Sequence, residues 1–143
     1  EAAISDKDEL LTYYIFNEPA LNTFSPEQAK KKDGYRNFKI IGEKKIYTRK
    51  LEKILDGFLA DDSQIDFLSI DVESFEMKVI KSNNWEKYKP KVIVVEKTDS
   101  SIADVLNSKL YSFLYNRDYE LFAKSFNSSI LVLKTEQALY ARK

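Results

Sequence analysis

Stretches of apolar residues divide the first third of the chain into strands and a helix. Leu10–Phe16 is rich in β-branched and aromatic residues, which predicts a strand. Ser25–Gln28 has the sequence of a helix start, because Ser can cap, Pro fits the first turn and Gln completes a capping box. Asp33-Gly34 ends this short basic helix. Lys39–Tyr47 predicts a strand, or a pair of strands that turns near Gly42.

The middle of the chain alternates between helical and extended patterns. Apolar residues recur at helical spacing from Leu51 to Leu59, which predicts a helix with Thr48 as its candidate N-cap. Ile65–Ile70 is short and mainly apolar, and it predicts a strand that stops at Asp71. A helical pattern then runs from about Ser74 to Ser82.

A run of β-branched residues marks the next strand. Lys91–Val95 is typical of a strand buried on both faces of a parallel sheet, and it stops at Glu96. One helix is predicted after it, with apolar residues from Ile102 to Phe113 on one face and a capping box formed by Ser101 and Asp104.

Two further strands, Tyr119–Ala123 and Ser129–Leu133, are joined by a short polar loop and predict an antiparallel hairpin. Strands that alternate with helices of crossover length imply right-handed βαβ units and a doubly wound α/β sheet. We therefore expect a mostly parallel sheet closed by a C-terminal antiparallel hairpin. Residues 1–143 carry no internal repeat or interdomain linker, so a single domain is predicted.

Composition excludes several classes of protein. Apolar residues make up 43% of the 143 residues and aromatic residues 13%, which excludes a disordered chain. The 23 basic and 23 acidic residues balance, so no net field draws the chain to nucleic acid or to a membrane surface. No apolar stretch approaches the roughly 20 residues of a membrane span, and no signal peptide is visible. A cytoplasmic location is predicted.

The absence of cysteine and histidine limits the chemistry further. No thiol nucleophile, disulfide or zinc-thiolate site can form, and proton transfer must use Asp, Glu, Lys or Tyr. No metal site is predicted, and any metal would be an oxygen-bound Mg²⁺, Mn²⁺ or Ca²⁺.

Acidic residues stand at the ends of two predicted strands. Ligands of open α/β sheets bind outside the carboxyl ends of the strands, which is where Asp71 and Glu96 lie, with Glu73 two residues after Asp71. A structural alternative is that Asp71 and Glu73 stabilise the start of the next helix through its dipole, and that Glu96 only precedes a loop. Asn22 and Thr23 follow the first long strand, where turn chemistry explains them about as well as substrate contact does.

Glycine is scarce and scattered. Gly34, Gly42 and Gly57 are isolated, and none opens a helix after a strand in a G-x-G pattern. A complete nucleotide-binding unit is therefore not predicted in this chain.

The segment Ile65–Glu96 (IDFLSIDVESFEMKVIKSNNWEKYKPKVIVVE) closely resembles the hallmark of FkbM-family methyltransferases. That family shows Ile/Leu-Asp-Val-Glu-Gly after a strand and, later, Arg/Lys-Pro-Lys-x-Ile-x-x-Glu. Ala3–Asp6 resembles the segment that closes its third strand, and Ala20–Phe24 resembles the loop that follows. Ser74 stands where the family usually has Gly, and Ser tolerates a positive φ poorly.

The resemblance implies a Rossmann-like class I methyltransferase fold that transfers a methyl group from S-adenosylmethionine to a hydroxyl of a sugar or natural-product-like acceptor. Because the chain has no histidine, we predict that Asp71 orients or deprotonates the acceptor of this reaction, with support from Glu73. A carboxylate base would need burial to raise its pKa. The resemblance further implies that Ala3 and Ser5 line the adenine side of the cofactor. Asn22, Thr23 and Glu96 are predicted to contact the acceptor because of their positions after strands.

The resemblance also implies that the family's first two strands, with their glycine-rich loop, would precede Glu1. We then expect the chain alone neither to bind S-adenosylmethionine tightly nor to methylate, and Ile65–Ile70 to lie at an open sheet edge. The alternative is a non-catalytic α/β module that pairs with another chain through that edge. The predicted partners are a small-molecule or glycan acceptor and, at this edge, a second copy or a missing N-terminal segment, with no nucleic acid and no membrane.

Overall fold

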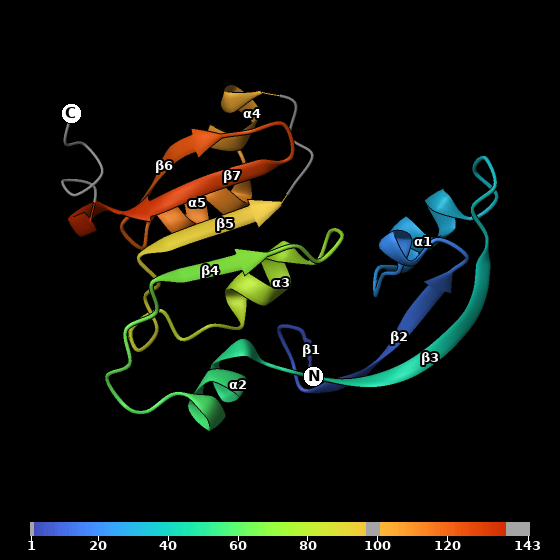
Figure 1. The fold of residues 1–143 in the computed structure, drawn as a ribbon, viewed down its shortest axis with the longest axis horizontal. Helices are drawn as coiled ribbons and strands as arrows, with labels where there is room; N and C mark the ends of the chain where they lie inside the picture. Colours follow the sequence, from blue (N-terminus) through green and yellow to red (C-terminus); the bar gives the residue numbers. More distant parts are fainter. Residues whose placement is uncertain (1, 97–100, 137–143) are drawn as a thin grey trace. The chain divides into compact units, whose positions relative to one another are not determined.

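The computed structural model describes residues 2–96 and 101–136, which form a mixed α/β structure with two sheets (Figure 1). Contacts divide these residues into two compact units. The first unit comprises residues 2–59 and 72–83, and the second comprises residues 60–71, 84–96 and 101–136. The mixed α/β class predicted from the sequence is confirmed, whereas the prediction of a single domain stays a prediction.

The first unit contains a three-stranded sheet in the order β1-β3-β2. Its strands are β1 (Ala3–Ile4), β2 (Glu9–Phe16) and β3 (Ile40–Arg49). β2 and β3 run antiparallel and β1 pairs with β3 in parallel. Gly42 pairs with Ile15 inside this ladder, so β3 is one continuous strand. Of the two alternatives predicted for Lys39–Tyr47, the single strand is confirmed and the strand pair that turns near Gly42 is wrong. An irregularity between Ile15 and Phe16 adjusts the register instead.

The helices of the first unit are α1 (Pro26–Lys32), α2 (Leu51–Phe58) and α3 (Glu76–Lys81). The predicted start of α1 is confirmed, because the Ser25 hydroxyl accepts a hydrogen bond from the Gln28 amide at 3.3 Å. The predicted cap of α2 is wrong. Thr48 is buried in β3, and its hydroxyl lies 3.1 Å from the Lys7 carbonyl and 3.0 Å from the Glu9 carbonyl.

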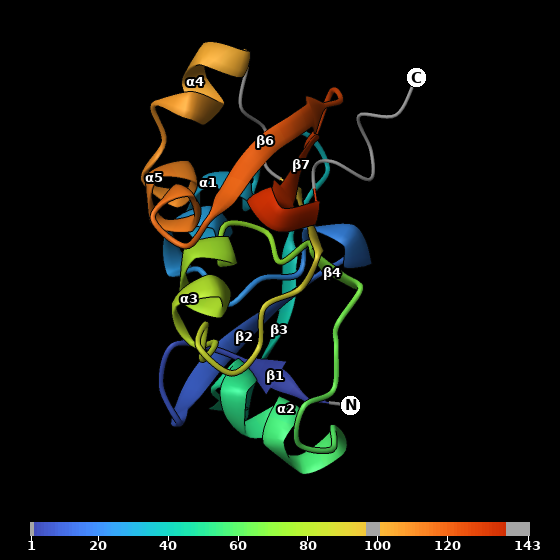
Figure 2. The same ribbon diagram turned by 90° about the vertical axis from the view of Figure 1, so that its left-hand side faces the viewer.

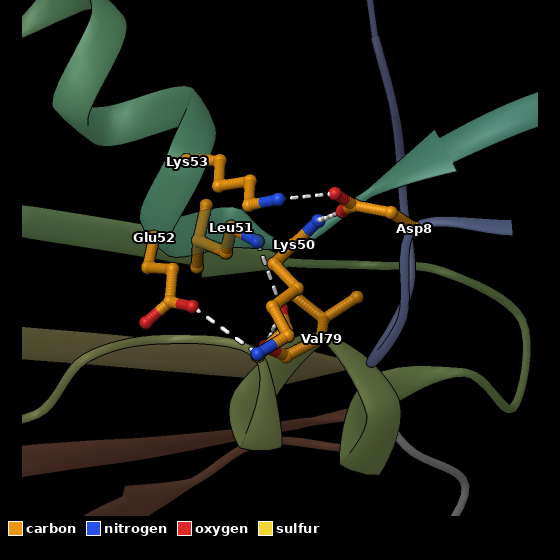
Figure 3. A network of polar contacts seen from close by, with 7 residues as sticks. Asp8, Lys50, Leu51, Glu52, Lys53 and Val79 are labelled. Carbon is orange, nitrogen blue, oxygen red and sulfur yellow. Dashed lines mark hydrogen bonds and ion pairs between the residues drawn. The ribbon is translucent and has the colours of Figure 1, made fainter.

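The amino end of α2 is capped by residues distant in sequence (Figure 3). The Asp8 carboxylate accepts from the Lys50 amide at 3.1 Å and pairs with the Lys53 ammonium. The Ser82 hydroxyl accepts from the Leu51 amide at 3.0 Å. These groups satisfy amides that an isolated helix leaves unpaired. Local sequence therefore could not identify the cap.

Asp8 is expected to make the stability of the protein depend on pH at the acidic end. The hydrogen bond from Lys53, and then that from the Lys50 amide, lower the pKa of Asp8 below its ordinary 3.8. The pKa of Asp8 is lower in the folded protein than in the unfolded chain. The stabilisation of the folded state by ionised Asp8 is therefore fully present above pH 3.8 and is lost as the pH falls through the folded pKa. Asp8→Asn should lower stability at neutral pH, and the difference from wild type should vanish in acid.

Urea unfolding at a series of pH values measures this effect. Glu18→Gln is the matched control, since Glu18 is an exposed carboxylate outside the cap. Equal stability of Asp8→Asn and wild type across the whole series would contradict the role of Asp8 as a cap.

The second unit contains a four-stranded sheet in the order β4-β5-β7-β6. Its strands are β4 (Phe67–Ile70), β5 (Val92–Glu96), β6 (Tyr119–Lys124) and β7 (Ser128–Leu133). β4 and β5 are adjacent and parallel, and β4 lies at an edge of this sheet, as the sequence predicts. β6 and β7 form the predicted antiparallel hairpin. Only β1–β3 and β4–β5 pair in parallel among the described strands, so the sheets are mixed rather than mostly parallel.

The burial of β5 differs between its two faces. Ile93 and Val95 are fully buried, whereas Val92 and Val94 are half-buried. The prediction of a strand buried on both faces is therefore wrong for one face. A continuous β-branched run does not distinguish a covered face from a partly covered one.

Two helices take the place of the single helix predicted after β5. α4 (Ile102–Leu106) is capped by Ser101, which accepts from the Asp104 amide at 3.1 Å as predicted. α5 (Lys109–Tyr115) begins anew because the Ser108 hydroxyl accepts from the Tyr111 amide at 3.0 Å. α5 lies beside β6 (Figure 2).

An aromatic cluster anchors the core of the second unit. The rings of Trp85 and Tyr119 meet edge to face at 5.7 Å, and both side chains are buried, as is Tyr88. The Tyr119 hydroxyl donates to the Pro90 carbonyl at 2.7 Å. Burial raises the pKa of the Tyr119 hydroxyl. In the described part of the chain, no helix has the length and apolar character needed to cross a bilayer.

Candidate functional site

A candidate site in the second unit is the carboxyl edge of the parallel pair β4–β5. Ile70 pairs with Val95, so Asp71 and Glu96 follow at the same edge of the sheet. This arrangement is the one predicted from the sequence. Glu96 is half-buried and forms the last residue of β5, where it pairs with Ser128, so the strand extends one residue beyond its predicted end. Asp71 is exposed, although a carboxylate base was expected to be buried.

A separate feature, which lies within the first unit, is a strained turn that follows β4 in sequence. Glu73 has φ +46° and Ser74 has φ +75°, so two consecutive residues other than glycine adopt the left-handed conformation. Each such residue costs on the order of 1–3 kcal/mol and persists only where surrounding contacts hold it. Ser74 occupies the position where the family pattern has Gly, and the structure shows why glycine suits it.

Three contacts hold this turn. The Lys32 ammonium donates to the Glu73 carboxylate at 2.8 Å, and the Thr23 hydroxyl donates to the Glu73 carbonyl at 3.3 Å. The Ser74 amide donates to the Glu76 carboxylate at 2.9 Å. The structure thus brings the predicted residues Thr23 and Glu73 together and adds Lys32. Sequence reasoning missed Lys32 because its basic helix has the composition of a solvated face.

Ser74→Gly is expected to stabilise the protein by about 1 kcal/mol, because glycine adopts a positive φ without steric cost. Urea unfolding followed by circular dichroism measures the change. Ser69→Gly in strand β4 is the matched control, and it should destabilise because Ser69 has no positive φ to relieve. A loss of stability in Ser74→Gly similar to that in Ser69→Gly would show that the turn is not strained.

The remaining predicted site residues fall into two groups. Asn22 and Ser5 are engaged locally: the Asn22 side-chain oxygen accepts from the Phe16 amide at 2.8 Å, and the buried Ser5 hydroxyl donates to Asp6 at 3.2 Å. These contacts favour the turn interpretation of Asn22 and leave Ser5 without an exposed side chain. Ala3 is different, because it lines an open hollow of about 590 Å³ in the first unit.

The hollow combines apolar, aromatic and basic walls. The Tyr13 and Phe24 rings lie 4.8 Å apart at one side. The lining residues are Ala2, Ala3, Tyr13, Phe24, Lys44, Lys45, Ile46 and Tyr47. Its volume is in the range of small-molecule sites. Among residues 2–96 and 101–136, no group of three acidic side chains lies close enough to hold a metal ion.

Comparison with known protein families shows to which family the chain belongs. Residues 1–121 match the Methyltransferase FkbM domain, which covers most of the 143 residues. The chain belongs to the FkbM methyltransferase family. It is therefore a methyltransferase by family resemblance, and the matched range includes Asp71, Glu73 and Glu96. No curated protein and no solved structure gives a significant match to this FkbM chain.

Proposed function

We propose that this FkbM domain is an S-adenosylmethionine-dependent O-methyltransferase that acts on a hydroxyl of a sugar or natural-product-like acceptor. The observation that carries the proposal is the parallel pair β4–β5, whose carboxyl ends place Asp71 and Glu96 at one edge. In open α/β sheets this edge is where ligands bind. Family membership supplies the class of reaction.

A Rossmann-like arrangement is part of the proposal. Its support is the second unit, in which a parallel pair of strands is extended by the antiparallel hairpin β6–β7. We also propose a cytoplasmic location, consistent with balanced charge.

The described residues fit the cofactor only in part. The Ala3 end of the hollow offers apolar and aromatic surface suited to a flat ring such as adenine. None of the three glycines provides a close backbone approach, because Gly34 follows α1, Gly42 lies in β3 and Gly57 lies in α2. Binding of S-adenosylmethionine through these residues alone should therefore be weak.

Asp71 is the proposed group for the acceptor. S-adenosylmethionine supplies an electrophilic methyl group when it is bound. The Asp71 carboxylate would accept a hydrogen bond from the acceptor hydroxyl, align its oxygen and take its proton as that oxygen is methylated. Alignment of the reacting atoms is the larger contribution in reactions of this kind, and it is worth up to roughly 7–11 kcal/mol in well-oriented systems.

The other acidic and polar residues receive narrower roles. Glu73 is paired with Lys32, so its carboxylate is committed to holding the strained turn rather than to proton transfer. Thr23 supports the same turn through the Glu73 carbonyl. Glu96 remains the candidate for a second contact to the acceptor at the edge that carries Asp71.

A radiolabel experiment tests the proposal. The protein as its gene encodes it is incubated with tritiated S-adenosylmethionine and separate pools of sugars, glycans and phenolic natural products. Transfer of label to a hydroxyl-bearing pool is the expected result. Label that appears only on amine-bearing acceptors would replace O-methylation with N-methylation, and no transfer to any pool would contradict the proposal.

A non-catalytic module is the second candidate function. It is favoured by the edge position of β4 in its sheet and by the 58% exposure of Phe67 on that strand. Unpaired strand edges invite pairing with another chain. Light scattering separates the two candidates when it is combined with the label experiment, since a module would associate without transferring label.

A further inference from the structure

The β6–β7 hairpin turns at the edge of the sheet that carries the candidate acids, and the proposed reaction gives it no role. Because β7 runs antiparallel to β5, its first residue lies where β5 ends, and Ser128 pairs with Glu96. The turn between β6 and β7 therefore lies at the end of the sheet to which β4 and β5 point (Figure 1). The hairpin, Asp71 and Glu96 all belong to the second unit.

A row of polar residues crosses the ends of three strands at this edge. The residues directly before Asp71 and Glu96 are paired in the β4–β5 register, so these two acids are level with each other. Glu96 and Ser128 are partners in the β5–β7 register, and the side chains of such partners share a face of the sheet. Neighbouring strands are about 4.8 Å apart, so the row from Asp71 to Ser128 spans roughly 10 Å. A single sugar ring is shorter than this row.

The turn at the end of the row presents an aromatic ring to solvent. The side chain of Phe126 is 90% exposed. A single exposed apolar side chain is common on protein surfaces, so exposure alone indicates no function. Phe126 is distinguished by its place at the end of the row and by the contacts that hold its turn.

Hydrogen bonds within residues 124–128 hold this turn. The Ser125 amide donates to the Ser128 carbonyl at 2.9 Å, and the Ser128 amide donates to the Ser125 hydroxyl at 3.3 Å. The Lys124 ammonium donates to the carbonyls of Ser125 and Phe126 at 3.0 and 3.2 Å. The backbone that carries the Phe126 ring is thus fixed before any ligand binds, which lowers the entropic cost of binding.

We infer that Phe126 is a specificity-determining residue that stacks on a second ring of the acceptor. The inference rests on the proposed function, which places the methylated hydroxyl at Asp71. The first ring would lie there, and Glu96 and Ser128 would hydrogen-bond hydroxyls between the two rings. The apolar face of the second ring would cover the Phe126 ring. The acceptor is therefore a molecule of at least two linked rings, such as a disaccharide or an aryl glycoside, rather than a monosaccharide.

Amide NMR spectra of the ¹⁵N-labelled protein test the inference with three probes: maltose, phenyl glucoside and methyl glucoside. Saturable shifts of the amides of Asp71, Glu96 and residues 125–128 are expected with at least one of the two-ring probes. Methyl glucoside has one ring and should bind at least about tenfold more weakly. Equal affinity for methyl glucoside, or no shift of residues 125–128 with either two-ring probe, would overturn the inference.

Variants of two exposed phenylalanines isolate the contribution of the ring. Phe126→Ala should weaken binding of the two-ring probe about tenfold because the stacking surface is lost, whereas Phe126→Trp should retain the affinity. Phe58→Ala is the matched control, since Phe58 is 84% exposed at the end of α2 in the first unit, and it should leave affinity within about twofold. Both alanine variants remove exposed side chains, so both should fold, which the same spectra verify. Equal affinities of Phe126→Ala and Phe58→Ala for the probe would overturn the inference.

The label experiment and the probe experiment can fail separately. Label transfer by the wild type, with no effect of Phe126→Ala on probe binding, would leave the proposed function intact and reject the inference. Binding of a two-ring probe that depends on Phe126, with no label transfer, would reject the proposed function and support ring binding at this edge. Cosedimentation with vesicles of phosphatidylcholine and phosphatidylserine that Phe126→Ala abolishes would assign the ring to a lipid surface and overturn the inference.

Discussion

Ile93→Asp should abolish cooperative folding of the protein. Ile93 is fully buried in β5, which lies between β4 and β7 in the four-stranded sheet. An unpaired carboxylate at this position costs several kcal/mol, while the total stability of a domain is about 5–15 kcal/mol. Circular dichroism and urea unfolding should show the loss of the native baseline at neutral pH.

Val94→Asp is the matched control on the same strand. Val94 is half-buried, so its carboxylate keeps access to water and the variant should remain folded with a lower midpoint. The sequence alone, which predicts β5 to be covered on both faces, expects Val94→Asp to unfold the protein as well. A folded Ile93→Asp variant with the urea midpoint of wild type would contradict the position of β5 in the core.

Asp71→Asn is expected to lower methyl transfer by about 10² or more, the usual contribution of a positioned base. The amide keeps the shape of the carboxylate and can still hydrogen-bond, but it cannot take the hydroxyl proton. Affinity for S-adenosylmethionine should change by no more than a few fold, because Asp71 acts on the acceptor. The measurement is kcat with the acceptor found in the label experiment, together with calorimetry of donor binding.

Asp62→Asn is a suitable control for this substitution. Asp62 is exposed and has φ +66°, a conformation that asparagine adopts as readily as aspartate, so activity and stability should be unchanged. Turnover near wild type in Asp71→Asn, accompanied by a lower melting temperature, would give Asp71 a structural role in place of the catalytic one. Loss of donor affinity in Asp71→Asn would move its role from the acceptor to the cofactor.

Patterns within a few residues were sufficient to predict most of the elements. The caps at Ser25 and Ser101 act on amides three residues away, so both were readable from sequence. The strand–helix–strand pattern around Asp71 and Glu96 predicted a parallel pair, because two strands joined by a crossover helix run in the same direction. The same local pattern placed both acids at one edge.

Contacts between distant residues decided what the sequence could not. Lys32 and Glu73 are 41 residues apart, and their ion pair leaves no periodic signal in the chain. The cap of α2 by Asp8 and Ser82 has the same origin, and it displaced the local candidate Thr48 into a buried strand. Ser108 ended one helix and began another, although the apolar spacing continued through it.

The tertiary structure also decided the division into two sheets and the solvent exposure of Asp71 and Glu96. The residue pattern of a strand indicates that a segment is extended, but it does not indicate which neighbouring strand the segment pairs with. The sequence therefore did not predict that β2 and β3 form a sheet separate from that of β4 and β5. Sequence placed Asp71 at the end of a strand, whereas its exposure depends on what surrounds that end. The sequence by itself determined most of the elements, the family and the acids of the candidate edge. The tertiary structure decided which side chains meet, because hydrogen bonds and burial depend on distance in space rather than along the chain.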